Sequence, residues 1–159
     1  MSALYKVILV IHILATVVGF GGFIAHSMYN ARALRATAAE AKVLFGVTLD
    51  VSKIATYAIV AIMPLGIVLI SLSDGVFEFS APWISASFVV WFAMLGVAGA
   101  LITKNLKAAA ARVAEMDPNA TVADDTEAVS ALKKVGAGDA ILQLLLVIAV
   151  VLMIWQPGN

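Results

Sequence analysis

Both histidines of the chain, His12 and His26, lie in one uncharged apolar stretch near the N-terminus. They are 14 residues apart, and Gly19 stands midway between them. Because an α-helix turns by about 100° per residue, a step of seven residues returns to almost the same face. A helix over this stretch therefore places His12, Gly19 and His26 on one stripe, with about 10 Å of axial rise between successive members.

Paired histidines about four turns apart on a transmembrane helix are typical of haem b ligation, with one axial ligand toward each membrane face. A glycine between them lets a porphyrin lie close to the backbone. Haem b is thus the candidate cofactor, with His12 and His26 as iron ligands and Gly19 as a cofactor-binding residue. The chain has no further histidine, so a second axial ligand comes from another copy or from a methionine, unless the iron is five-coordinate. The candidate methionines are Met63, Met94 and Met153.

A purely structural role competes with this hypothesis, because intramembrane histidines more often bond a neighbouring helix than a metal. His12 is then a hydrogen-bonded residue in a helix interface, His26 lies near the membrane surface, and Gly19, Gly21 and Gly22 allow close packing. Two histidines without a carboxylate or thiolate partner are weak evidence for zinc. The chain has no cysteine and no hydrolase triad, phosphate loop or dinucleotide motif. We expect no catalytic residue; an enzyme here would be a haem-associated membrane oxidoreductase.

The composition predicts an integral membrane protein. Of the 159 residues, 63% are hydrophobic and only 13% are charged, whereas soluble domains average nearer half and a quarter. The net charge of zero gives no electrostatic basis for binding nucleic acid. The length suits one transmembrane domain over residues 1–159, whose first partner is the lipid bilayer.

Uncharged runs long enough to cross a membrane predict an all-α, up-down-up-down four-helix bundle. The expected spans are residues 4–28, 51–72, 83–103 and 140–155. Trp83 and Trp155 stand at span ends, where tryptophan is typical of an interfacial anchor. The polar connections at 31–50 and 104–139 are the expected cytoplasmic loops.

Local signals predict where the helices are interrupted. The helix formers at 31–42 favour an extension of the first helix beyond the membrane. Gly46 and Thr48 then mark a turn. Residues 136–138, with two glycines, are expected to end a short helix before the fourth span.

Three charged residues flank the spans. Asp50 and Lys53 begin the second span, and Asp139 begins the fourth. They are expected to reach the surface, or to pair with one another across the bundle.

The basic residues predict the orientation. Only Lys6 lies on the side of the termini and of the 72–81 loop. The two other connections hold Arg32, Arg35, Lys42, Lys53, Lys104, Lys107, Arg112, Lys133 and Lys134. By the positive-inside rule both termini face outward, in a plasma (inner) membrane.

The segments 6–22, 73–83 and 138–157 resemble a bacterial family of four-span predicted integral membrane proteins of unknown function. The resemblance covers nearly the whole chain and implies a fold and a location, not an activity. His12 followed by Gly21 and Gly22 is also similar to the opening helix of two wider groups, the copper-resistance D-type proteins and the small membrane protoporphyrinogen oxidases. The oxidases imply haem association and match at His12, but they have an arginine where this chain reads Phe23 to His26.

Three functions compete. The first is an accessory or structural subunit of a membrane complex or homo-oligomer, whose contacts use the small residues Gly96, Gly99 and Ala100. The second is a membrane b-type haem protein or redox subunit using His12 and His26. The third, a transport helper for a small solute or metal, is disfavoured because the spans lack the carboxylates that ion pathways use.

Overall fold

The computed structural model describes residues 2–158, and in that range the chain is helical apart from short connections and one isolated β-bridge. The elements are α1 (Ala3–Ala33), α2 (Ala38–Ser71), α3 (Pro82–Gly96), the π-helix η1 (Val97–Thr103), α4 (Lys104–Ala114), the 3-10 turn η2 (Val122–Asp124) and α5 (Thr126–Trp155). Because α3, η1 and α4 are continuous, the described residues form four rods of 30 to 34 residues, each long and apolar enough to cross a membrane. The predicted four-helix bundle is confirmed.

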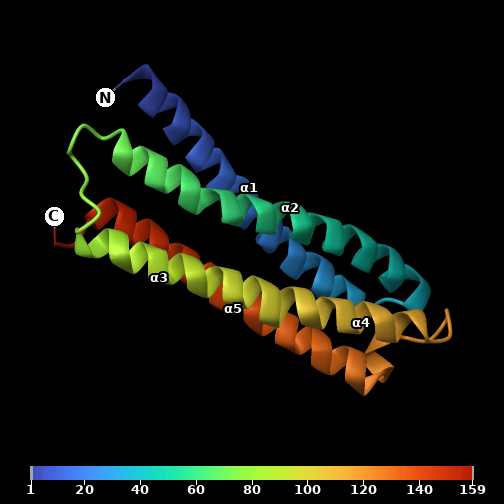
Figure 1. Ribbon diagram of the computed structural model, residues 1–159. Coiled ribbons are helices and arrows are strands. Elements are labelled where there is room, and N and C mark those ends of the chain that lie inside the picture. Colours follow the sequence, from blue (N-terminus) through green and yellow to red (C-terminus); the bar gives the residue numbers. More distant parts are fainter. Residues whose placement is uncertain (1, 159) are drawn as a thin grey trace.

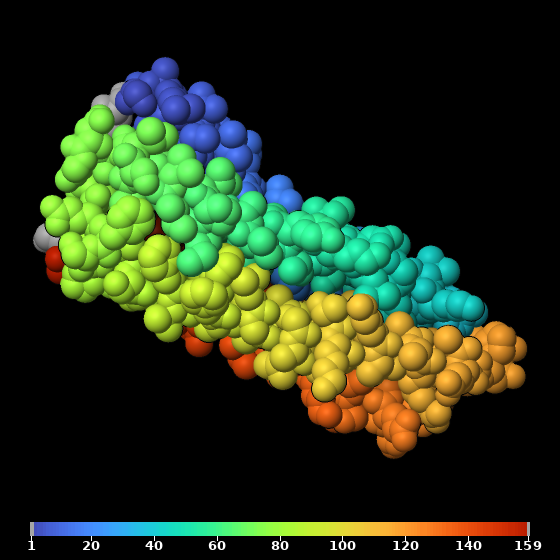
Figure 2. All heavy atoms as spheres, in the orientation of Figure 1, coloured from blue at the N-terminus to red at the C-terminus, as the bar shows by residue number. Residues whose placement is uncertain are grey.

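The rods alternate in direction (Figure 1). α1 and α2 form one antiparallel hairpin, and α3–η1–α4 forms a second hairpin with α5. Both ends of the chain and the connection between α2 and α3 lie at one end of the bundle, which we call the terminal end. The connections after α1 and after α4 lie at the opposite end, the basic end. Figure 2 shows the resulting elongated molecule.

The first hairpin turns earlier than the sequence suggested. α1 ends at Ala33 and α2 begins at Ala38, so the predicted turn at Gly46 and Thr48 is wrong. The start of α2 is fixed by a capping box: the Glu40 N–H donates to Thr37 Oγ1 at 3.4 Å, and the Thr37 N–H donates to Glu40 Oε2 at 3.1 Å. This reciprocal pair satisfies two N–H groups that a helix start leaves open.

The predicted interruption at 136–138 is also wrong, because α5 runs unbroken from Thr126 to Trp155. Asp125 caps its start and accepts a hydrogen bond from the Ala128 N–H at 2.9 Å. That backbone bond, together with the guanidinium of Arg112, holds the pKa of the Asp125 carboxyl below its usual value. Gly138 marks a close approach of helices rather than a helix end, since an added Cβ would lie 2.7 Å from Ile102 Cγ1.

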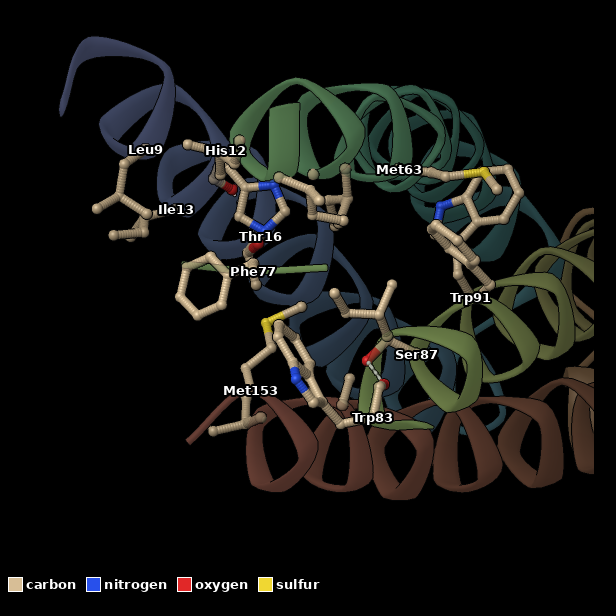
Figure 3. Close-up of a pocket in the computed structure, with 18 of the residues that line it drawn as sticks. Leu9, His12, Ile13, Thr16, Met63, Phe77, Trp83, Ser87, Trp91 and Met153 are labelled. Atoms are coloured by element: carbon tan, nitrogen blue, oxygen red, sulfur yellow. Dashed lines mark hydrogen bonds between the residues drawn. The ribbon is translucent and has the colours of Figure 1, made fainter. Parts of the chain in front are cut away.

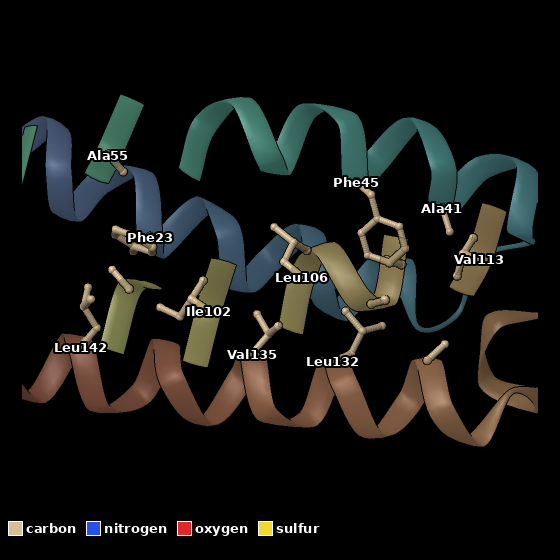
Figure 4. Close-up of a cluster of buried hydrophobic side chains, with 14 of the residues drawn as sticks. Phe23, Ala41, Phe45, Ala55, Ile102, Leu106, Val113, Leu132, Val135 and Leu142 are labelled. Atoms are coloured by element: carbon tan, nitrogen blue, oxygen red, sulfur yellow. The ribbon is translucent and has the colours of Figure 1, made fainter. Parts of the chain in front are cut away.

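The basic end is closed by backbone hydrogen bonds between the two hairpins. The Ala38 N–H donates to the carbonyl of Ala120 at 2.8 Å, and the Val122 N–H donates to that of Ala36 at 3.1 Å. An apolar core continues into this end (Figure 4), formed by Ala41, Phe45, Leu106, Val113, Leu132 and Val135. The hairpins diverge toward the terminal end (Figure 1).

Two of the predicted packing glycines hold α1 against α2. A Cβ at Gly19 would lie 3.0 Å from Ile59 Cγ1, and one at Gly22 would lie 2.7 Å from Ala55 Cβ. At Gly21 an added Cβ would meet nothing within 4 Å. The close contact between α1 and α2 therefore depends on Gly19 and Gly22, which face α2, and not on Gly21.

We predict that Gly22→Ala destabilises the protein by about 1–3 kcal/mol, because the added methyl group must push α1 and α2 apart. Thermal unfolding of the purified protein in detergent, followed by circular dichroism, measures the loss. Gly21→Ala is the matched control and should not lower the unfolding temperature. Equal effects of the two substitutions would contradict the close approach at Gly22.

Candidate functional site

A cavity of about 320 Å³ lies among the four rods in the terminal half of the bundle. Its walls are mainly aliphatic and aromatic, with a few polar groups contributed by His12, Thr16, Ser87 and Gln156. This volume falls at the lower end of the range for small-molecule sites, which are typically apolar with few polar groups. The cavity exists because the two hairpins diverge here, whereas close contacts fill the other half.

His12 projects from α1 toward the interior of this cavity (Figure 3). Its side chain lies on the buried face of α1, and the residue is only 8% exposed. The ring interacts with the backbone of Ile62, but Nδ1 has no hydrogen-bond partner. Gly66 on α2 lies beside the ring, and a Cβ there would be in ordinary contact with His12 Cε1 at 3.6 Å. An imidazole with unused hydrogen-bonding capacity thus borders an apolar space.

Trp83 lines the same cavity instead of facing outward. It is 9% exposed and packs edge-on against Phe77, with ring centroids 5.6 Å apart. Its indole Nε1 is buried without a partner. The prediction that Trp83 is an anchor at the membrane surface is therefore wrong. Trp155, for which the same role was predicted, is 76% exposed. By contrast, Trp91 in the same wall donates from Nε1 to the carbonyl of Ile59 at 2.7 Å, which ties α3 to α2.

All three candidate methionine ligands, Met63, Met94 and Met153, also line this cavity. They come from α2, α3 and α5, so each of the other rods brings a thioether to the space that His12 borders. Figure 3 shows Met63 and Met153 in different walls of the cavity. Sequence reasoning had no signal for this convergence, because it depends on how far each rod is rotated about its own axis.

His26 belongs to a separate site on the basic side of the cavity. It is fully buried, and its Nδ1 lies 3.1 Å from Asp139 Oδ2. The same carboxylate oxygen accepts hydrogen bonds from Ser27 Oγ at 3.2 Å and from Asn30 Nδ2 at 3.5 Å. The predicted stripe on α1 is therefore buried, but its two histidines have different neighbours.

Gly19, between the histidines, faces α2 rather than the cavity, and Ile59 occupies the space beside it. A porphyrin finds no room there, so the geometry does not fit a haem that uses Gly19 for clearance. The donor set around the cavity does fit a haem-type group, since an imidazole and a thioether are a known axial pair. Within residues 2–158 no group of three or more His, Cys, Asp or Glu could hold a metal ion by itself.

Asp139 is the site residue that sequence reasoning misplaced. It does not pair with Lys53, whose Nζ instead contacts Asp50 Oδ1 at 3.0 Å on the exposed surface. Ser27 and Asn30, one and four positions after His26, were a signal for a polar face on α1. The partner on α5 follows only from the helix arrangement.

Four apolar rods, a buried polar cluster and an intramembrane cavity define a polytopic integral membrane protein. The chain belongs to a family of predicted integral membrane proteins, DUF2269, whose family model matches residues 6–157. The sequence resemblance to a four-span family of unknown function is thereby confirmed. Neither a curated protein nor a solved structure matched the chain.

Proposed function

We propose that the protein is a small membrane redox subunit that holds a haem-type prosthetic group in the cavity of its terminal half. One observation supports this most: His12, nine-tenths buried with an unpartnered ring nitrogen, shares an apolar cavity with three thioethers. An imidazole whose ring is already oriented against a backbone needs little reorganisation to bind a metal.

In this proposal His12 and one of Met63, Met94 and Met153 would hold the group. A methionine thus takes the place of His26 as the second ligand, because His26 Nδ1 already contacts Asp139. When bound, haem supplies one-electron transfer. The chain itself contributes the ligands and an apolar wall that excludes water, both of which set the reduction potential.

The cavity walls favour electron transfer over ion transport. Of its lining residues only Tyr5 and His12 have ionisable side chains, and none carries a carboxylate or a fixed positive charge. Ion and proton pathways through membranes normally use such charges. A transport role therefore ranks below a redox role.

We predict that protein purified in mild detergent, or loaded with haem, shows a Soret absorption band. His12→Ala should lower haem occupancy by about ten-fold or more, because a ligand is lost. One of Met63→Leu, Met94→Leu and Met153→Leu should shift the band toward a five-coordinate spectrum. Met28→Leu is the control and should have no effect, since Met28 is 64% exposed on α1.

A colourless, folded wild-type protein that does not take up haem would contradict this function. So would a His12→Ala variant that retains the wild-type spectrum.

A second candidate function, a subunit that holds a membrane complex together, is favoured by one surface. Gly96, Gly99 and Ala100 are exposed on the rod formed by α3, η1 and α4, and an added Cβ at either glycine would meet nothing within 4 Å. These small residues thus serve no packing within the described chain. Small residues on transmembrane helices are typical of interfaces between helices. The two functions are compatible, because small redox subunits work within complexes.

We predict that Ala100→Cys forms a disulfide or bifunctional cross-link in membranes, since the chain has no native cysteine to interfere. The mass of the product distinguishes a second copy from another subunit. Gly96→Leu should reduce the yield several-fold by separating the helices. Ile54→Cys, 61% exposed on α2 and so on a different rod, is the control and should give no product. An Ala100→Cys protein that never cross-links would exclude this surface as an interface.

We also propose that the basic end faces the cytoplasm of a cell whose plasma (inner) membrane holds the protein. In the structure eight of the nine basic residues assigned to the two connections lie in helices and Arg35 lies in the connection after α1, and all nine are on the half of the bundle beyond the apolar cavity. A bias of this size in short connections sets the orientation of membrane proteins.

We predict that Ser80→Cys, in the connection between α2 and α3, reacts with an impermeant thiol reagent on intact cells. Asn119→Cys, in the connection after α4, should react only after the membrane is opened. Both side chains are exposed, and the cysteine-free wild type is the blank. The reverse pattern of labelling would overturn this orientation.

A further inference from the structure

The buried polar cluster on α1 and α5 lies apart from the cavity and has no part in the proposed redox site. Asp139 is 1% exposed and His26 is 0% exposed. Within residues 2–158 these two, His12 and Tyr5 are the only ionisable side chains in the buried set. Burying a carboxylate in an apolar bundle is costly unless its charge is balanced.

The hydrogen bonds around Asp139 leave its charge unbalanced. Oδ2 has three polar neighbours, but Oδ1 has none. Ser27 and Asn30 are neutral donors. His26 with a proton only on Nδ1 is neutral as well, so an ionised Asp139 gives the cluster a net charge of −1 in this arrangement.

His26 Nδ1 has two neighbours that require opposite roles of it. It lies 3.1 Å from Asp139 Oδ2, an acceptor, and 3.0 Å from Asn30 Nδ2, a donor. A single ring nitrogen either donates or accepts, so the two contacts correspond to different positions of the proton. With Asp139 ionised, Nδ1–H donates to the carboxylate; with Asp139 protonated, a bare Nδ1 accepts. The cluster therefore has a hydrogen-bonding arrangement for both charge states.

The unpartnered atoms show that the cluster is incompletely satisfied. Besides Asp139 Oδ1 they are His26 Nε2 and Asn30 Oδ1. Ser52 Oγ on α2 is also buried without a partner. A Cβ added at Gly22 would lie 3.6 Å from Val51 Cγ1 and 2.7 Å from Ala55 Cβ, so Ser52 is within about one turn of His26 along the bundle. If the cluster served only to hold α1 against α5, its polar atoms would be expected to have hydrogen-bond partners, since buried polar atoms without partners cost stability.

The charged groups on the surrounding elements are all at the surface. On α2, Asp50 and Lys53 pair with each other. The others are Arg32 on α1, Lys104 at the start of α4, and Lys133 and Lys134 on α5, all exposed, while Tyr29 on α1 is half-buried. The polar contacts of Asp139 in the described chain are His26, Ser27 and Asn30, so the balancing charge must be taken up by the cluster itself.

We propose that His26 and Asp139 form a buried site that binds one exchangeable proton. The proton comes from water and is taken up at His26 Nε2 as the Nδ1 proton moves to the Asp139 carboxylate, giving a neutral carboxylic acid beside a neutral imidazole. A neutral pair costs less to bury than an imidazolium–carboxylate pair, since no charge is desolvated. On release, the carboxyl proton moves to His26 Nδ1 and the proton on Nε2 leaves to water, which restores the carboxylate and the Nδ1–H donor. His26 and Asn30 position the site by accepting or donating as the charge changes.

Infrared difference spectroscopy of the protein in lipid nanodiscs tests this directly. As the pH is changed over the folded range, a C=O stretch of a protonated carboxyl should appear and disappear reversibly. Asp139→Asn should abolish it, and Asp50→Asn, an exposed matched control, should not. His26→Gln keeps a hydrogen-bonding group that does not titrate, and it should shift the midpoint by about one pH unit or more.

If Asp139→Asn does not fold, isotope-labelled aspartate in the wild type separates aspartate bands from glutamate bands, and the shift in His26→Gln, which alters a neighbour of Asp139, then decides. An Asp139 that stays in one protonation state throughout the folded range would overturn the proposal. So would a midpoint unchanged by His26→Gln. Either result would make the cluster a fixed clamp between α1 and α5.

Discussion

Close contact between helix backbones is the constraint on which the rest of this structure depends. In a bilayer, apolar side chains gain little by leaving lipid for a helix interface, so van der Waals contact and interhelical hydrogen bonds must hold the rods together. Gly22 lets α1 meet α2, and Gly138 lets α5 meet η1. Each hairpin therefore has a contact that one added methyl group would disturb. The cavity and the polar cluster occupy the spaces between these contacts.

The two ends of the bundle are built differently, and this difference separates the two sites. At the basic end, backbone hydrogen bonds link the connections after α1 and α4, and apolar side chains fill the space between the rods. At the terminal end the hairpins diverge and leave an apolar cavity bordered by His12. The His26–Asp139 pair lies on the basic side of that cavity. A lipophilic group and a polar cluster can thus be held in one small bundle without contact.

Much of the fold could be predicted from the sequence because apolar runs of membrane length leave few alternatives to a helical bundle. The wrong predictions of helix ends concern glycine, which can end a helix but can also lie inside one where two helices pack closely. Gly46 and Gly138 read as breaks but lie inside helices, and the capping pair of Thr37 and Glu40 was the better signal for the turn.

The candidate site was predicted only in part. The buried stripe of His12 and His26 follows from helical periodicity. The neighbours of each histidine do not, because Asp139 lies 113 residues away from His26 in the chain. Such contacts depend on the rotation of each rod about its axis, which a nearly uniformly apolar sequence specifies weakly.

The π-helix η1 has a consequence for how the third rod serves both halves of the molecule. A π-helical turn closes hydrogen bonds one residue later than an α-helical turn, so it holds extra chain without lengthening the rod in proportion. The faces before and after η1 are thereby rotated relative to each other. Met94, before η1, borders the cavity, while Leu106 and Val113, after it, fill the core of the basic end. A chain one residue shorter in this segment would turn α4 by about 100° and bring a different face of it to the core. The length of this segment, more than its composition, keeps the two halves of the third rod in register with their separate neighbours.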